Sequence, residues 1–336
     1  MTKTYQLIIF VTILLASVTI INCNKKTPLV YEERVVVTNR AAGTLSYIDP
    51  ATDQVVQTQT IAGSEPMYII YLPSKDRLLV GDRLQSKIHV INPATQTVET
   101  SIAVGSGVMH MSVDAQAKQL WAAGDLSNTL TVINLNTYTV EKTINIGIKP
   151  HDVFLSSDGT KAYVSVQPGV GIQDSIYVFS TATYDKQLSK AAGTFLHLYF
   201  SAVNNKLYVA SQSGTFSVLD PSNLNQISSV TIPGAHGLVL SSDEKTAYIG
   251  NFVGDQLYMF NNSSNTLGSN ITSTVTPPVH NIAVNEAGDK LYAAHSGASS
   301  QSVSVYTIQN GTFTQGPTIT VGTNPNSLVY YKREVK

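Results

Sequence analysis

The sequence predicts an all-β fold, and its composition and residue pattern lead to that prediction. Charged residues make up only 13% of the chain, about half of the ~25% that is usual in soluble domains. Ser, Thr, Asn and Gln take their place together with 17 Tyr, a composition typical of β-rich surfaces. Apolar and polar residues alternate with period two in one segment after another, and helical periodicity is missing.

An internal repeat predicts the architecture. Each copy has two well-marked strands, a weaker polar strand and then a short apolar strand, all separated by turn residues. The central residue of the short apolar strand recurs at Ile69, Met111, Val153, Leu198, Leu238, Ile282 and Leu328. Four strands every 40 to 46 residues are typical of propeller blades, so we predict a seven-bladed β-propeller with four-stranded antiparallel blades.

The two ends of the repeat predict how the ring closes. Residues 34–61 contain only three of the four strands, and Pro325–Tyr331 is a single strand with nothing after it. We therefore expect the C-terminal strand to complete the first blade, which would remove the exposed sheet edges. Residues 31–336 are predicted to form a single propeller domain.

The N-terminus resembles a bacterial lipoprotein signal. Lys3 precedes the apolar run Leu7–Ile21, and Cys23, the only cysteine, follows it directly. The run is shorter than the ~20 residues of a spanning helix. The resemblance implies that residues 1–22 are a signal peptide, that Cys23 is the lipidation site and that 23–30 form a tether. An uncleaved N-terminal anchor is the alternative. The expected location is the envelope of a bacterium, on a membrane-anchored lipoprotein facing the periplasm or the cell surface.

The strand motifs also resemble the YVTN-type β-propeller repeat family. The matching segments are AYVSV at Ala162, LYVAS at Leu207, AYIGN at Ala247 and LYAAH at Leu291, with an spDG-like turn in SSDGTKAY from Ser156. The resemblance covers nearly everything from residue 31 onward. It implies the fold but not one function, because relatives include surface-layer proteins, lactonase-like enzymes and propeller parts of redox enzymes.

Charge and cysteine content exclude some classes of site. The net charge is −1, which argues against nucleic acid as a partner because affinity for a duplex depends on clustered Lys and Arg. One cysteine also excludes an intrachain disulfide and any metal site built from several cysteines. Catalytic motifs such as G-x-S-x-G and H-E-x-x-H are missing as well, so no catalytic residue is predicted.

Histidines gather at one level of the predicted ring. Five of the seven histidines fall in two adjacent columns at the start of the innermost strands. We expect His151, His236 and His280 to be the first candidates for metal ligands, with His110 and His197 as further candidates. The alternative is that these histidines only close turns and bond to neighbouring blades. No cofactor is required by the sequence, and a divalent metal is the one that this cluster would accept.

The same mouth of the channel should receive the ends of the second strands. The polar residues expected there, as candidates for ligand binding, are Arg40, Asp82, Arg83, Asp125, Asn251 and His295. The leading hypothesis is a non-enzymatic, lipid-anchored scaffold, monomeric, whose polar rim binds a protein, glycan or small ligand. The alternative is a metal-binding or lactonase-like hydrolytic enzyme that uses the histidine cluster.

Overall fold

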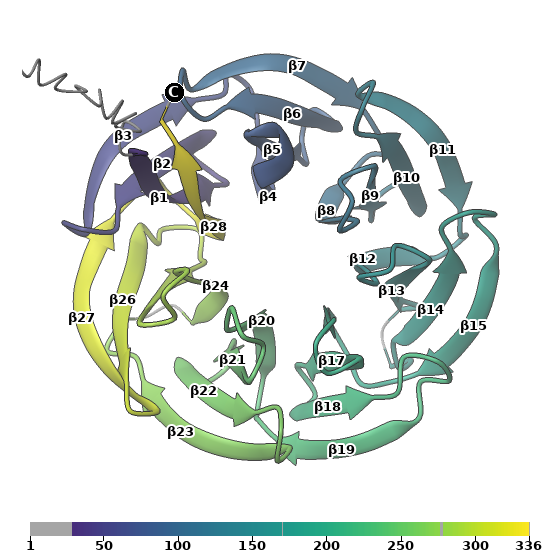
Figure 1. The fold of residues 1–336 in the computed structure, drawn as a ribbon. Helices are drawn as coiled ribbons and strands as arrows, with labels where there is room; N and C mark the ends of the chain where they lie inside the picture. The colour runs from purple at the N-terminus through teal and green to yellow at the C-terminus, as the bar shows by residue number, and fades with distance from the viewer. Residues whose placement is uncertain (1–28, 170, 276–277, 336) are drawn as a thin grey trace, which may run out of the picture.

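A computed structural model describes residues 29–169, 171–275 and 278–335 and confirms the predicted all-β, seven-bladed propeller. Each blade is a four-stranded antiparallel sheet, and the seven sheets stand around a central channel with their innermost strands facing the axis (Figure 1). Among the described residues, no helix is long and apolar enough to cross a membrane. Residues 1–28, which contain the expected signal peptide and Cys23, lie outside the described part of the chain.

Each of the first four blades runs from an innermost strand at the channel to an outermost strand at the rim. Blade 1 contains β28 (Pro325–Glu334), β1 (Tyr31–Asn39), β2 (Thr44–Asp49) and β3 (Gln54–Thr60). Blade 2 contains β4 (Pro66–Leu72), β5 (Arg77–Asp82), β6 (Lys87–Asn92) and β7 (Thr97–Ala103), with the 3₁₀ turn η1 (Pro73–Lys75) after β4. Blade 3 contains β8 (Val108–Val113), β9 (Gln119–Gly124), β10 (Thr129–Asn134) and β11 (Thr139–Asn145). Blade 4 contains β12 (Lys149–Leu155), β13 (Lys161–Gln167), β14 (Ser175–Ser180) and β15 (Lys186–Ala191).

The other three blades repeat this order. Blade 5 contains β16 (Leu196–Ser201), β17 (Lys206–Ser211), β18 (Thr215–Leu219) and β19 (Gln226–Thr231). Blade 6 contains β20 (Ala235–Leu240), β21 (Thr246–Asn251), β22 (Gln256–Asn261) and β23 (Thr266–Thr272). Blade 7 contains β24 (Val279–Val284), β25 (Lys290–His295), β26 (Ser302–Gln309) and β27 (Thr312–Thr320).

The C-terminal strand closes the ring as predicted. β28 is the innermost strand of blade 1 and pairs antiparallel with β1, from Tyr31 opposite Glu334 to Asn39 opposite Pro325. These two strands extend beyond the other strands at the channel mouth where β1 begins. First and last segments of the chain therefore share one sheet.

The core of the propeller lies between the blades. Buried apolar side chains form seven clusters, and each cluster joins two neighbouring blades. Trp121, which is fully buried on β9, packs in the cluster that joins blades 3 and 4, and its indole ring lies 6.4 Å from the ring of Phe179. Because every cluster needs two blades, no blade has a complete core of its own, and the ring is stable only as a whole.

The innermost strands carry a regular distortion close to where they begin. Six of the seven have a β-bulge there, at which two residues lie opposite one on the next strand. β16 has none, and His197 alone stands between Leu196 and Leu198 in an unbroken register. A bulge turns side chains out of the regular alternation, so histidines from different sequence columns can reach the same space.

Candidate functional site

The structure brings the five channel histidines together at the mouth where the innermost strands begin. Their rings form a continuous contact series. Ring centroids are 5.3 Å apart for His110 and His151, 4.9 Å for His151 and His197, 3.9 Å for His197 and His236, and 4.6 Å for His236 and His280. The first four are buried and His280 is half-buried. These contacts join blades 3 to 7.

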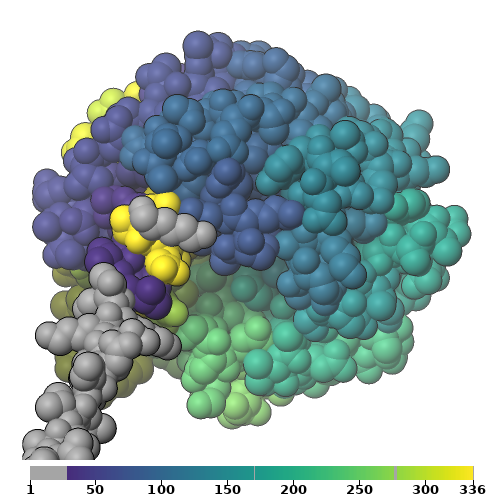
Figure 2. Space-filling model, turned by 45° about the horizontal axis from the view of Figure 1, so that its top comes forward, coloured from purple at the N-terminus to yellow at the C-terminus, as the bar shows by residue number. Residues whose placement is uncertain are grey.

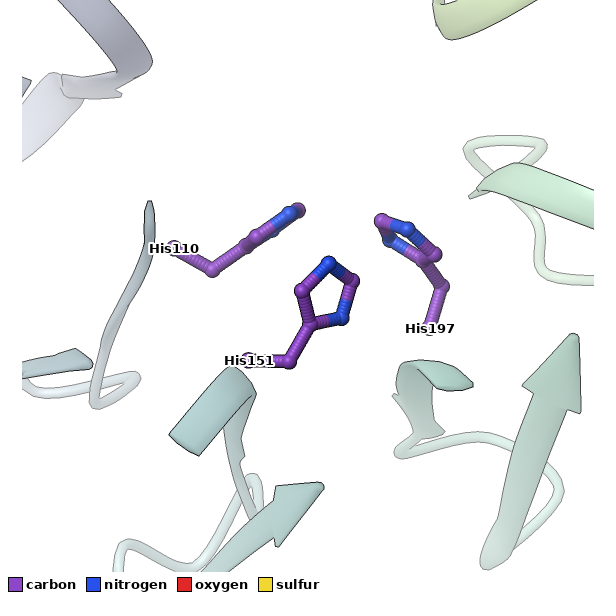
Figure 3. A group of neighbouring side chains, drawn as sticks. All are labelled: His110, His151 and His197. Carbon is purple, nitrogen blue, oxygen red and sulfur yellow. The ribbon is translucent and has the colours of Figure 1, made fainter. Parts of the chain in front are cut away.

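Three of these histidines lie close enough together to be candidate ligands of one metal ion. One ring nitrogen from each of His110, His151 and His197 lies within 4.8 Å of the other two, and the three rings face a common space (Figure 3). A tetrahedral zinc ion, with Zn–N bonds of about 2.0–2.1 Å, would hold such nitrogens about 3.3 Å apart. Binding would therefore draw the ring nitrogens together by at most about 1.5 Å, estimated from the same bond lengths.

This trio differs from the trio that the sequence predicts first. His151 belongs to both sets, but the structure adds His110 and His197 and places His236 and His280 beside the group rather than in it. The sequence columns put His110 and His197 one position further along their strands than His151. In β8 and β12 the two residues of the bulge lie opposite a single residue of the next strand, and in the regular β16 His197 alone lies opposite one residue. The three histidines therefore lie at the same height along the channel.

An oxygen atom lies near the Nδ1 atom of each of the three rings. The Nδ1 atom of His151 lies 3.3 Å from the backbone oxygen of Leu196. Asp152 lies between the other two rings, with Oδ1 3.3 Å from Nδ1 of His110 and Oδ2 3.8 Å from Nδ1 of His197. Nδ1 atoms that face oxygen leave the Nε2 atoms for a metal, an arrangement in which an outer carboxylate or carbonyl fixes the ligating ring.

Burial keeps the trio neutral at neutral pH. Loss of water around the rings lowers the pKa of His110 and of His197 well below the usual value, and it lowers the pKa of His151 to about 4. A neutral imidazole has the lone pair that a metal needs, so the site can bind an ion without first releasing protons.

Asp152 is itself unusual. Its carboxyl group is buried. It accepts one hydrogen bond from the backbone N–H of Leu198 at 2.8 Å and another from the backbone N–H of Val153 at 2.7 Å. Burial raises the pKa of Asp152 to about 7, although these two N–H groups act in the opposite direction. In the sequence, Asp152 is only one polar residue in the column that also contains His110 and His197. Its role could not be predicted there, because its contacts come from three different blades.

Asp82, a predicted ligand-binding residue, has a structural role in the described chain. It is fully buried, and Oδ1 accepts the backbone N–H groups of Glu65, Leu84 and Gln85, each at 3.0 Å. Oδ2 lies 3.1 Å from Nε2 of His89. Asp82 therefore fixes the turn after β5 and joins it to the segment that enters blade 2.

The charged residues predicted at the rim form ion pairs between blades. Arg83 donates two hydrogen bonds to Asp125, at 2.6 and 3.1 Å, and Lys149 lies 3.6 Å from the same carboxylate. Arg40 pairs with Glu65. Paired in this way, these side chains tie blade 1 to 2, blade 2 to 3 and blade 3 to 4.

The last two predicted rim residues also have partners within the ring. The Oδ1 atom of Asn251 accepts the backbone N–H groups of Val253 and Gly254, each at 2.7 Å, and so fixes the turn after β21. His295 is fully buried, with Nε2 2.8 Å from the hydroxyl of Ser304.

Comparison with known proteins supports the fold. No protein-family model and no curated protein matches the sequence. Among solved structures, the chain is similar to a periplasmic gluconolactonase from Pseudomonas aeruginosa, with 17% identity, a TM-score of 0.73 and coverage of 90% of this chain and 99% of that one. A putative 6-phosphogluconolactonase from Bacteroides fragilis is 16% identical, with a TM-score of 0.70 and coverage of 89% of this chain and 98% of that one. Hydrazine synthase from Kuenenia stuttgartiensis is 15% identical, with a TM-score of 0.68 and coverage of 80% of this chain and 92% of that one. At these identities the likeness shows that the chain shares their propeller fold, and the fold alone.

Proposed function

We propose that this propeller binds one divalent transition-metal ion through His110, His151 and His197 and uses it to hydrolyse a small ester or lactone. The observation that carries the proposal is the convergence of three buried, neutral imidazoles within 4.8 Å. Three histidines leave one position of a tetrahedral ion open, as catalytic zinc sites do.

Hydrolysis fits what surrounds the trio. When bound, an ion held by these three imidazoles would activate water near neutral pH and polarise a carbonyl oxygen. In the net reaction, water adds to the carbonyl carbon, the ester C–O bond breaks and the leaving oxygen takes the proton, so an ester gives an acid and an alcohol and a lactone gives one hydroxy acid. The chain's own contribution is to hold the rings: Asp152 would orient His110 and His197, and the carbonyl of Leu196 would orient His151. Two of the structural neighbours are named as a gluconolactonase and a putative 6-phosphogluconolactonase.

The non-enzymatic scaffold is the weaker proposal on the same structure. It needs free polar groups at the rim, whereas Arg40, Arg83 and Asp125 are engaged with one another or with neighbouring blades. A rim whose charges are internally paired offers less to a charged partner.

Metal binding is tested with zinc and two matched alanine variants. The full-length, metal-free chain is expected to bind one Zn²⁺. His110→Ala is expected to weaken this binding by at least ~100-fold. Loss of a group that only orients a ligand costs about 10–100-fold in metal affinity, and loss of the ligand itself should cost more. His280→Ala removes a channel histidine outside the trio and should change the affinity by less than about 3-fold, well under that outer-partner effect. Titration calorimetry gives both numbers, and the absorption of Co²⁺ in place of zinc reports tetrahedral coordination.

Two results would contradict the assignment. Loss of zinc in His280→Ala with retention in His110→Ala would favour the trio His151, His236 and His280 instead. A wild-type chain that takes up no zinc or cobalt would make the histidines structural.

We also propose that the chain is a YVTN-type lipoprotein anchored to the envelope through Cys23. The support is the apolar run and the lone cysteine in the sequence, together with the start of β1 at the mouth opposite the histidines. Expressed in a bacterium, the protein should fractionate with membranes and carry an acyl mass at Cys23, while Cys23→Ala should lose both. Membrane association of Cys23→Ala without an acyl group would point to the uncleaved anchor.

A further inference from the structure

A cavity of about 260 Å³ lies along the central channel, directly next to the metal trio. One end of it is lined by polar residues at neighbouring positions near the start of the innermost strands: Tyr68, His110, Asp152, His197 and Asn281. Two of the three proposed metal ligands, His110 and His197, therefore line the cavity, so a molecule bound in it would lie beside the proposed metal site.

The rest of the cavity is mostly aliphatic and aromatic, with Tyr71, Tyr199 and Tyr330 as its tyrosines. At the next two residue positions along the innermost strands, the wall consists of aliphatic and aromatic side chains. Ile70, Phe154, Tyr199, Val239 and Val329 are half-buried there, so they present apolar surface to the channel rather than to the blade interfaces alone. Phe154 and Tyr199 lie against each other with ring centroids 4.5 Å apart.

Charge is confined to the polar end. Asp152 is the one carboxylate among the described residues that line the cavity, and no Lys or Arg lines it. A phosphate or carboxylate on the body of a ligand would be buried there without a counter-charge, and several hydroxyls would face a mainly aliphatic and aromatic wall with few hydrogen-bond partners. Sugar lactones and their phosphates fit this wall poorly.

The two mouths differ in access. On the histidine side, Phe252 lies 5.0 Å from His236 and 5.5 Å from His280, and Phe195 lies 6.2 Å from His151, all between ring centroids. These aromatic rings lie against the histidine cluster on that side. The innermost strands end at the opposite mouth, where Tyr71 and Tyr330 line the cavity. Figure 2 shows the C-terminal part of β28 (yellow) beside the start of β1 (dark purple).

We infer that the cavity is the substrate chamber of the proposed hydrolase, that it takes an uncharged alkyl or aryl lactone or ester rather than a sugar lactone, and that the substrate enters from the mouth opposite the histidines. The inference rests on the proposed function for the identity of the reacting group. The chamber itself follows from the lining. Its volume is below the ~300–1,000 Å³ of pockets for drug-sized ligands, so the substrate is small.

The test compares two lactones on the zinc-loaded, full-length chain. δ-Octalactone carries an alkyl tail, and δ-gluconolactone carries hydroxyls on a ring of the same size. We expect kcat/KM for δ-octalactone to be at least ~10-fold higher, from the burial of about two CH₂ groups or more. Val239→Phe should narrow the chamber and lower that kcat/KM by at least ~10-fold, the size of effect that one misfitting hydrophobic group produces. Val98→Phe makes the same change on the exposed outer strand β7 and should leave it unchanged.

Binding is measured separately from turnover, so that the two proposals can fail independently. Saturation-transfer NMR should show that δ-octalactone binds the wild-type chain and Val98→Phe but not Val239→Phe. If zinc binds and neither lactone is hydrolysed, while this binding pattern holds, the hydrolase is wrong and the chamber stands. Equal or better hydrolysis of δ-gluconolactone, or a Val239→Phe variant that binds and hydrolyses δ-octalactone normally, would overturn the chamber.

Discussion

A chain that ends at Asn324 is expected to lose the cooperative fold, because the ring can no longer close. Without β28, the strand β1 becomes an unpaired edge of blade 1, and the side chains of Leu328 and Tyr331 leave the clusters that join blade 1 to blades 7 and 2. Burial of one such side chain contributes about 1.5–3 kcal/mol. Arg333, which pairs with Glu32 at 2.8 Å and with Asp76 at 3.0 Å, is lost as well.

The sum of these lost contributions approaches the free energy of unfolding of ~5–15 kcal/mol that is typical of a whole domain. Near-UV circular dichroism and urea unfolding of the shortened chain should therefore show no cooperative transition, and a synthetic peptide of residues 325–336 should restore part of it. Lys332→Ala, on the same strand, removes a half-exposed ion pair with Glu286 and should change the stability by less than ~1 kcal/mol. A cooperative transition of the shortened chain at the wild-type midpoint would show that blade 1 does not need its fourth strand.

Acidification from pH 7.5 to 5 is expected to destabilise the metal-free protein. The pKa of His151 is about 4 in the folded chain against 6.5 ordinarily, so below pH 6.5 the unfolded chain takes up a proton that the folded chain does not. That difference favours unfolding as the pH falls towards 4, by about 2 kcal/mol at pH 5 for this residue. The pKa values of His110, His197, His236 and His280 are lowered by the same loss of water and act in the same direction.

Asp152 opposes the histidines. Its pKa is about 7 in the folded chain against 3.8 ordinarily, so between these values the folded chain holds a proton that the unfolded chain releases. Its contribution to stability therefore grows as the pH falls from 7 towards 4. Five histidines outweigh one carboxyl group, and the net effect is destabilising.

Urea unfolding in EDTA at pH 7.5, 6.5, 5.5 and 5.0 measures the balance. The midpoint should fall steadily for the wild-type chain and more steeply for Asp152→Asn, because that variant has no carboxyl group to take up a proton. A midpoint that rises on acidification would mean that the histidines of the channel are protonated in the folded chain.

The position of the histidine level explains why the site lies where it does. Innermost strands of a propeller start at one mouth, so residues at the same strand position meet around the axis although they are about 40 residues apart in the sequence. A ring of seven short strands can therefore gather His110, His151 and His197, each from a different blade, without any long loop. Rigid strands hold such ligands more accurately than loops do.

The sequence by itself determined the number of blades, the four strands of each, the closure by Pro325–Tyr331 and the level of the five histidines. These features are periodic: strands alternate with period two, blades recur every 40 to 46 residues, and a count of residues places each copy. The tertiary structure decided which three histidines meet, because bulges in β8 and β12 and their absence from β16 shift side chains by a fraction of a residue. It also placed Asp152 between His110 and His197, paired Arg83 with Asp125 and engaged Asp82 in the turn after β5. Most of these contacts join different blades, and all of them depend on distances that no spacing along one chain records.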